Sequence, residues 1–344
     1  MIPRPAEPAG PGSPADRAAD TLAGKFSAWT GGLDLHSTAP DDRMALLRGL
    51  YRAGRQDLAF ARLLEGHVDA IQLLGRTSAT ETARERTDAL VASGASFGVW
   101  NADLRDAPLS LNGDQLFGGK AFASGAGLIS HALVTLHAGD KERVQLLLID
   151  LAEHPPEIDT SWWNVLGMQA SETHLVRWKG AAISENCKIG GPGDYETEPW
   201  FSGGALRFVA AQAGGVAAIF DHARDHLVRA GRVEDPHQAA RLASLYSCAH
   251  QCASVVRDTA SAWHDSSIEE NLAHVRHARL VVLELGERAI LLAQQSVGVQ
   301  SLFRDHPLSA VLSNLMVYLR QPAPDAQKHA VGLAAADGRL SPDL

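Results

Sequence analysis

Apolar residues recur at three- and four-residue steps through the first third of the chain, which is the spacing of one buried face on an α-helix. The pattern begins at Asp41 and is interrupted near Gly54 and Gly75, so it predicts two or three helices, and a further helix covers 79–93. We therefore predict an N-terminal helical domain over residues 21–96. The apolar positions that carry the pattern are Met44, Leu46, Leu47, Leu50, Tyr51, Leu58, Ala59, Leu63, Leu64, Val68, Ile71, Leu73 and Leu74.

The period then falls to two, as expected of β-strands with one buried face. Residues 109–111 and 115–117 flank the turn Asn112-Gly113-Asp114, and Asn-Gly favours the backbone of a tight hairpin turn. Further strand-like runs, with Gly and Pro clusters between them, are Ser130–Leu136, Val144–Leu151 and His174–Trp178. Because no helical pattern intervenes, we predict a small antiparallel sandwich or barrel over residues 97–198.

After Pro199 the helical period returns and persists. It predicts three helices much longer than the average of about 11–12 residues, namely Leu206–Ala230, Pro236–His264 and Ile268–Gln295. The first is rich in Ala and Gly, which indicates closely packed helices. We predict a C-terminal four-helix bundle over 199–332 and a tail over 333–344. The fold class is α+β, with an N-terminal helical domain, a central antiparallel β-domain and a C-terminal bundle of long helices.

Composition narrows the function. Residues 1–20 hold five prolines and almost no large apolar side chain, so we predict a disordered arm there. The net charge of −9 argues against a nucleic-acid or anionic-membrane binder, since both need a basic face. No apolar run reaches the roughly 18–20 residues that a membrane helix requires. Three cysteines cannot form a disulfide framework and no signal-peptide pattern is present, so we expect a soluble, cytoplasmic protein.

Common enzyme motifs are absent. The Gly clusters do not follow a strand and open a helix as GxGxxG, and no P-loop, GxSxG or HExxH sequence occurs. Cys248 and Cys252 flank His250, but no second Cys/His pair has matching spacing, so packed thiols are favoured over half of a metal site. Trp162 and Trp163, at a polar loop edge, either stack on a ligand ring or brace a sheet.

Four segments, in order along the chain, resemble those of the acyl-CoA dehydrogenase superfamily. They are an N-terminal helix at 61–68 (ARLLEGHV), a hairpin at 111–125 (LNGDQLFGGKAFASG), a turn at 167–173 (GMQASET) and the C-terminal helices at 298–308 and 318–322. The resemblance covers about residues 42–332. It implies FAD bound between the β-domain and the bundle, with a second subunit of a homodimer or homotetramer supplying part of the site.

The resemblance also assigns residues to the flavin ring. The strand around Trp100 would lie near the ring. Phe122, Ala123 and Ser124 match the stretch that lines it, where backbone groups hydrogen-bond the flavin. An isoalloxazine accepts a hydride only when it is held flat, dry and close to the substrate carbon, so these assignments are chemically consistent.

Other assignments concern the diphosphate end of the cofactor. By the resemblance, Arg229 or Arg232 would approach the pyrophosphate, although the lengths of the two chains differ there. Gln294, Gln295 and Gly298 match the family segment that contacts the adenine-diphosphate part held by the neighbouring subunit.

The chain departs from the family at the catalytic base, because it lacks the C-terminal glutamate that removes the α-proton of an acyl thioester. Asp325 is the nearest candidate for the base, with His329, Glu234 and Asp235 as alternatives. Without the resemblance, the position of Asp325 after two prolines favours a solvated carboxylate in a turn. The net negative charge of the chain does not attract an anionic CoA, so local arginines would have to bind it. Arg207 is the first candidate for this role.

Three functions are consistent with these matches and with the missing glutamate. The first is an FAD-dependent dehydrogenase that acts on the CH–CH bond of an acyl thioester, with an electron-transfer partner. The second is a monooxygenase of the same fold, which uses oxygen and reduced flavin from a separate reductase and needs no such glutamate; residues 321–332 are similar to the tail of those enzymes. The third is a non-catalytic flavin-binding or assembly relative.

Overall fold

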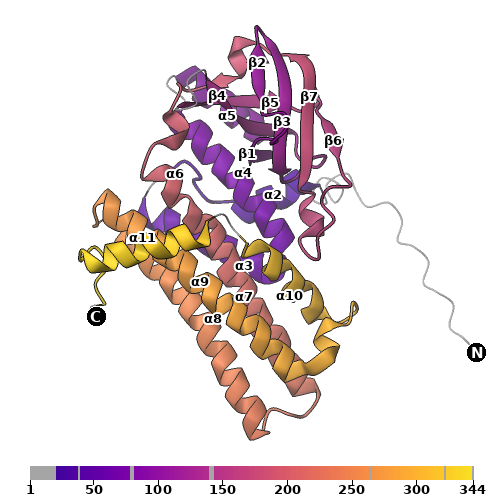
Figure 1. The fold of residues 1–344 in the computed structure, drawn as a ribbon, viewed down its shortest axis with the longest axis vertical. Helices are drawn as coiled ribbons and strands as arrows, with labels where there is room; N and C mark the ends of the chain where they lie inside the picture. The colour runs from indigo at the N-terminus through magenta and orange to yellow at the C-terminus, as the bar shows by residue number, and fades with distance from the viewer. Residues whose placement is uncertain are drawn as a thin grey trace, which may run out of the picture.

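The computed structural model describes residues 21–37, 39–77, 81–138 (backbone only at 81–84 and 138), 143–263, 265–320 and 323–342. The arm predicted at 1–20 lies outside these residues. Figure 1 shows the strands gathered at one end of the molecule and the long helices running side by side at the other.

Four helices precede the first strand in the described part: α2 (Leu22–Thr30), α3 (Pro40–Gln56), α4 (Leu58–Thr77) and α5 (Glu81–Ala92). The predicted N-terminal helices are therefore confirmed. The break between α3 and α4 falls at Asp57, a few residues beyond Gly54. There the Asp57 carboxylate accepts hydrogen bonds from the backbone N–H groups of Ala59 (2.8 Å) and Phe60 (3.1 Å) and caps α4.

Helix α3 packs closely against α7 (Ala205–Arg229), because glycines on each helix face the backbone of the other. A Cβ atom at Gly54 would lie 2.0 Å from the carbonyl oxygen of Ala211, and one at Gly214 would lie 2.0 Å from that of Tyr51. These approaches leave no room for a side chain. The close packing predicted from the Gly- and Ala-rich sequence is confirmed.

The described residues of the β-region form two sheets of four strands, ordered β1-β4-β5-β8 and β2-β3-β7-β6. The strands are β1 (Phe97–Trp100), β2 (Ser110–Asn112), β3 (Gln115–Ala123), β4 (His131–Ala138), β5 (Arg143–Asp150), β6 (Glu157–Asp159), β7 (His174–Ala182) and β8 (Lys188–Ile189). The predicted hairpin is β2–β3, with Gly113 at φ 65° in its turn. The antiparallel prediction holds except at β1, which pairs parallel to β4. The chain forms β2 and β3 in the other sheet before it returns, so β4 runs in the direction of β1.

The described part of the C-terminal region consists of α6 (Trp200–Gly203), α7, α8 (Pro236–Ala262), α9 (Ile268–Val297), α10 (Pro307–Tyr318) and α11 (Pro324–Ala336). The three predicted long helices begin and end within two residues of α7, α8 and α9. Asp235 caps α8, and Ser267 forms a reciprocal capping box with Glu270 at the start of α9. Helix α11 continues to Ala336, beyond residue 332. The α+β fold class is confirmed.

Helix α7 forms the centre of the bundle. The stretch Trp200–Arg229 is apolar and long enough to cross a membrane by length and composition, but 72% of its apolar window is buried inside the protein. Cys248 and Cys252 point from α8 into the same core, where burial raises the pKa of the Cys252 thiol to about 12. In the described ranges no cluster of His, Cys, Asp and Glu has the geometry of a metal site.

Candidate functional site

A cavity of 1120 Å³ lies where the sheets meet the bundle, and we call it the sheet–bundle cavity. One wall is the edge of the β-domain, with Asn101 and Ala121, and the other is formed by Ile290 of α9 and by Met316 and Val317 of α10. Single-ligand pockets usually have volumes of about 300–1,000 Å³. The sheet–bundle cavity therefore has room for a ligand as large as a flavin together with a second small molecule.

A chain of hydroxyl groups ends in the sheet–bundle cavity at Ser124. Ser171 Oγ lies 2.7 Å from the carbonyl oxygen of Met168 and 2.7 Å from Thr173 Oγ1, and Thr173 Oγ1 lies 3.0 Å from Ser124 Oγ. The backbone of Ser124 is held from behind, because Trp100 Nε1 donates to its carbonyl oxygen at 3.0 Å. Each hydroxyl has one proton, so when Ser171 donates to Thr173 and Thr173 donates to Ser124, the Ser124 proton is free for a ligand in the cavity.

Strained backbone surrounds the same cavity. Phe122 (φ 54°), Met168 (φ 59°) and Glu172 (φ 41°) are three of the four non-glycine residues with positive φ in the described part of the chain. Met168 is fixed by Asn314 of α10, whose Oδ1 accepts from its backbone N–H at 2.6 Å. Phe122 remains 56% exposed, and its ring meets Trp162 edge-on at 4.8 Å. Residues with such unfavourable backbone conformations are concentrated at active sites and ligand-binding sites.

The sheet–bundle cavity has little negative charge. Glu287 of α9 is the one carboxylate among the described residues that line it, and it forms an ion pair with Arg320 at the end of α10. Both side chains are about half exposed, so the pair lies toward the mouth of the cavity. The Glu287 carboxylate is therefore already engaged by a guanidinium.

A second cavity of 490 Å³ adjoins the first, and the two share Arg62, Val99 and Asn101 as lining residues; we call it the seam cavity. Arg62 Nη1 lies 2.5 Å from Glu65 Oε2, and Glu65 is only 5% exposed. Burial raises the pKa of the Glu65 carboxyl, and the adjacent Arg62 opposes that shift. The seam cavity therefore contains a buried titratable pair next to the sheet–bundle cavity.

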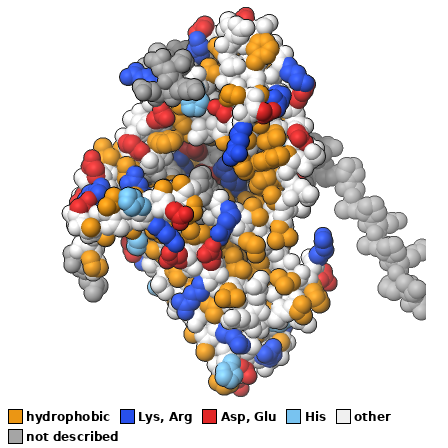
Figure 2. All heavy atoms as spheres, in the orientation of Figure 1, with side chains coloured by type: hydrophobic (Ala, Val, Ile, Leu, Met, Phe, Trp, Pro, Cys, Tyr) orange, Lys and Arg blue, Asp and Glu red, His pale blue; other side chains and the backbone are white. Residues whose placement is uncertain are grey.

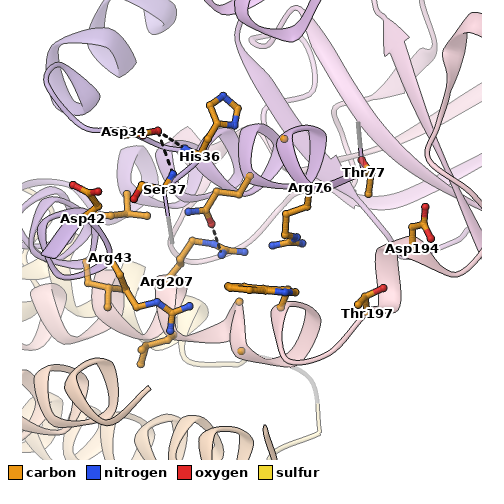
Figure 3. Close-up of a pocket in the computed structure, with 18 residues that line it drawn as sticks. Asp34, His36, Ser37, Asp42, Arg43, Arg76, Thr77, Asp194, Thr197 and Arg207 are labelled. Atoms are coloured by element: carbon orange, nitrogen blue, oxygen red, sulfur yellow. Dashed lines mark hydrogen bonds between the residues drawn. The ribbon is translucent and has the colours of Figure 1, made fainter. Parts of the chain in front are cut away.

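A third cavity, of 780 Å³, opens between α3, α4 and the start of α7, and we call it the arginine cavity (Figure 3). Arg43, Arg76 and Arg207 line it, and Arg76 and Arg207 also line the seam cavity. Arg207 forms an ion pair with Asp69 and donates to Gln72 Oε1 at 2.7 Å. The three cavities thus follow one another from the sheets to the outer face of α4.

The sequence-predicted flavin residues lie in or next to the sheet–bundle cavity. Phe122 and Ser124 line it, whereas Ala123 is fully buried and lines none of the three cavities. Trp100 is 1% exposed and positions Ser124 instead of lining the cavity itself. Arg207, predicted to bind substrate, lies in the wall between the seam and arginine cavities and is neutralised by Asp69.

The remaining predicted site residues lie elsewhere. Asp325 is exposed on the first turn of α11 and lines none of the three cavities, so the geometry gives no support to its role as a base. Arg229 is exposed at the end of α7. Gln294 and Gln295 are in the last turn of α9 and Gly298 caps that helix, again outside the three cavities. Within one subunit none of these five residues lines the cavity that contains Phe122 and Ser124.

Several residues of the site were not predicted from the sequence. Arg62 and Glu65 are three residues apart in the apolar stretch 61–68, and two opposite charges on a buried helix face are the signal that identifies them. Thr173 ends the predicted family turn. Arg43 and Arg76 come together only in the folded chain.

Comparison with known proteins supports the fold. No family model and no curated protein matches the sequence. Solved structures match nearly the whole chain, at low identity. FMN-bound TdsC from Paenibacillus sp. A11-2 superposes with a TM-score of 0.78 at 15% identity, over 95% of this chain and 94% of that one. KijD3 in complex with dTDP matches with a TM-score of 0.75 at 18% identity, over 94% and 91% of the two chains.

Butyryl-CoA dehydrogenase from Megasphaera elsdenii matches with a TM-score of 0.74 at 13% identity, over 93% of this chain and 88% of that one. The order of helices, two sheets and long helices is therefore shared with an acyl-CoA dehydrogenase over most of both chains. The resemblance found in the sequence motifs is confirmed at the level of the fold: this chain has the acyl-CoA dehydrogenase fold.

Proposed function

We propose that this chain is a flavin-dependent oxidoreductase that binds its flavin in the sheet–bundle cavity. The described residues fit such a ring system. Ser124 offers a hydroxyl group, Phe122 and Trp163 offer aromatic faces, and Ile290 and Val317 form an apolar wall. TdsC and KijD3, which share the fold, have each been crystallised with FMN. When bound, a flavin supplies hydride transfer and, in its reduced form, reactivity toward oxygen.

We propose that the reaction is a monooxygenation that uses reduced flavin and oxygen. The observation that carries this choice is the absence of an unpaired carboxylate on the described lining of the sheet–bundle cavity, where Glu287 is paired with Arg320. Removal of an α-proton needs a base within reach of the substrate, and Asp325 is exposed on α11. Oxygen chemistry instead needs apolar surroundings, and Ile290, Met316 and Val317 give the cavity an apolar wall. TdsC is a dibenzothiophene monooxygenase.

Under this proposal the chain's own residues bind, orient and exclude water. The Ser124 hydroxyl would donate a hydrogen bond to the bound flavin, and Thr173 and Ser171 would orient it through their contacts with Ser124. Met316 and Val317 close the cavity on the side of the bundle. A separate flavin reductase would deliver the reduced cofactor.

One observation favours acyl-thioester dehydrogenation as a second candidate. The Glu65 carboxyl, with its raised pKa, lines the seam cavity beside the residues shared with the sheet–bundle cavity. A carboxylate in that position could serve as the base that the C-terminal segment lacks. In that case an electron-transfer partner would reoxidise the flavin.

The deciding experiment follows the flavin with and without oxygen. The purified protein is reconstituted with FMN or FAD, reduced chemically without oxygen, and mixed with aerated buffer and a candidate aromatic or amine substrate. Oxygen-dependent product formation supports the monooxygenase. Anaerobic bleaching of the oxidised flavin by an acyl-CoA supports the dehydrogenase instead. A protein that takes up neither flavin would be the non-catalytic relative predicted as the third possibility.

We further propose that the active form is a cytoplasmic homodimer or homotetramer. Gln294, Gln295 and Gly298 then face a second subunit, as the family resemblance implies. Exposed apolar side chains next to them support this, with Val299 68% and Phe303 52% exposed. If that segment completes an adenine site the cofactor is FAD, and otherwise it is FMN. Light scattering of the purified protein and mass spectrometry of the released flavin test the two points separately.

A further inference from the structure

The arginine cavity contains positive charge that the described part of the protein does not neutralise. Arg43, Arg76 and Arg207 line it together. Arg207 is paired with Asp69, but no described carboxylate forms an ion pair with Arg43 or Arg76. Two guanidinium groups beyond the one paired by Asp69 therefore share one concave space.

The charge of Arg207 acts on the guanidinium groups of Arg43 and Arg76. Burial, with the charge of Arg207, lowers the pKa of Arg43 to about 9 and that of Arg76 to about 10. Both causes destabilise the charged forms of Arg43 and Arg76, because these side chains have lost hydration and are repelled by Arg207. An anion bound among them would offset both effects.

Unused hydrogen-bond donors lie at the same place. Arg43 Nη1 and Arg207 Nε are buried and have no hydrogen-bond partner in the described structure. Arg43 is held in position by the ring of Trp263, whose centre lies 3.7 Å from the guanidinium carbon. Gly203 permits this contact, because a Cβ there would lie 2.1 Å from the indole of Trp263. Buried donors without acceptors are rare in proteins and indicate a missing partner.

The carboxylates of the arginine cavity belong to its periphery. Asp34 accepts hydrogen bonds from the backbone of His36 and Ser37, and Asp194 accepts one from the backbone of Gly191. Both are exposed. Figure 3 shows Asp34, Asp42 and Asp194 around the edge of the cavity, with Arg76 and Arg207 turned toward its middle. The middle of the cavity is therefore its positive part.

We propose that the arginine cavity binds the phosphate or pyrophosphate group of a small phosphorylated ligand, with Arg43 and Arg76 as its principal donors. A guanidinium presents parallel N–H groups that match phosphate oxygens, and charged hydrogen bonds of this kind are strong. The volume of 780 Å³ exceeds the needs of an inorganic ion, and Trp200, which lines this cavity and the seam cavity, offers a ring face to a planar organic part. The site stands independently of the flavin reaction.

Binding of pyrophosphate and of ADP to the intact protein tests the proposal, by calorimetry and by thermal denaturation at constant ionic strength set with chloride. The variants are Arg43→Met and Arg76→Met. Methionine keeps the apolar stem and its contact with the neighbouring indole. The matched control is Arg48→Met, at an exposed position of α3 that does not line the cavity. Arg207 is not replaced, because its loss would leave Asp69 unpaired.

We expect binding to weaken about tenfold or more in each cavity variant and to stay unchanged in Arg48→Met. A merely structural arginine would lower the melting temperature of the unliganded protein. Here that temperature should hold or rise, because a repelling cation has been removed. The two variants are measured separately, so a folding defect in one leaves the other as the test.

The ligands also distinguish two sources of the phosphate. Tighter binding of ADP than of pyrophosphate assigns the site to an organic phosphate, and equal binding assigns it to a free phosphate anion. Binding of neither ligand, or equal weakening by Arg48→Met, overturns the proposal.

Discussion

Lys120 Nζ lies 2.6 Å from Oδ1 of Asp103, and the lysine side chain is fully buried. The same ammonium group donates to the carbonyl oxygen of Asn101 at 3.0 Å and to Thr135 Oγ1 at 2.8 Å, so all three of its protons are used. Asn101 lines both the sheet–bundle and the seam cavity. A buried cation on β3 therefore fixes the wall of the proposed flavin site from behind.

Replacement of this lysine should destabilise the whole β-domain. In Lys120→Met the Asp103 carboxylate, which is only 19% exposed, loses its cation, and breaking such a buried pair costs about 3–5 kcal/mol. Urea denaturation measures the free energy of unfolding. Lys179→Met is the matched control, because Lys179 and its partner Glu157 are 65% and 63% exposed and contribute little. Equal losses in the two variants would contradict the structural role of Lys120.

The hydroxyl chain makes a prediction about flavin affinity. Thr173→Val removes the group that holds Ser124 at 3.0 Å, and Ser124→Ala removes the hydroxyl itself. One hydrogen bond contributes about 1 kcal/mol, so each variant should bind flavin about fivefold more weakly. Quenching of flavin fluorescence on titration gives the dissociation constant. Ser110→Ala, at an exposed position of β2, should leave it unchanged.

The variant with both substitutions tests whether Thr173 acts on the flavin directly or through Ser124. If Thr173 acts only through Ser124, then Ser124→Ala with Thr173→Val should bind flavin no more weakly than Ser124→Ala alone. Additive losses would show that Thr173 contacts the ligand directly.

The sequence predicted those parts of the fold that depend on local patterns. The three long helices show apolar residues at helical spacing without interruption, and α8 and α9 begin at recognisable capping residues. The β2–β3 hairpin contains an Asn-Gly turn. The parallel pairing of β1 with β4 could not be predicted, because it depends on where the chain returns after forming β2 and β3 in the other sheet. The strands β6 and β8 are too short to show a period.

The candidate site was predicted only where a contiguous motif forms it. Phe122 and Ser124 belong to one stretch that resembles a known family and line the same cavity. The arginine cavity, by contrast, joins Arg43, Arg76 and Arg207 from three helices, and no local pattern links such distant positions. Asp325 was chosen by its place after α10, but the sequence does not show that α11 presents it to solvent.

The contact of α3 with α7 predicts opposite effects for two glycines of one helix. Gly54→Ala would place a Cβ atom 2.0 Å from the carbonyl oxygen of Ala211, so the helices must separate, at a cost of about 1–3 kcal/mol or more. Gly49→Ala meets nothing within 4 Å and should stabilise α3 by up to about 1 kcal/mol, because alanine favours a helix. Melting temperatures measure both. A destabilised Gly49→Ala together with a neutral Gly54→Ala would show that the two helices do not pack as described.

A buried histidine predicts a loss of stability in acid. His67 is 4% exposed, stacks on Phe26 at 4.5 Å, and accepts the backbone N–H of Phe97 at Nδ1 (3.2 Å), so its ring is neutral in the fold. Burial lowers its pKa from 6.5 to about 4. The unfolded chain therefore binds a proton near pH 6.5 and the folded chain only near pH 4. The contribution of His67 to stability is complete above pH 6.5 and falls as the pH drops toward 4, by about 3 kcal/mol in all.

His67→Asn isolates this effect, because the Asn oxygen can replace Nδ1 as the acceptor for Phe97 but does not titrate. The free energy of unfolding, measured by urea denaturation at steps between pH 7 and 4, should fall less steeply in the variant than in the parent protein. His250→Asn is the control, because His250 is exposed on α8 and its replacement should leave the pH dependence unchanged. The other histidines are the same in both proteins, so the difference between the two curves is the quantity to compare. Parallel curves for His67→Asn and the parent would show that His67 binds its proton over the same pH range in the folded and the unfolded chain, and the lowered pKa would then be wrong.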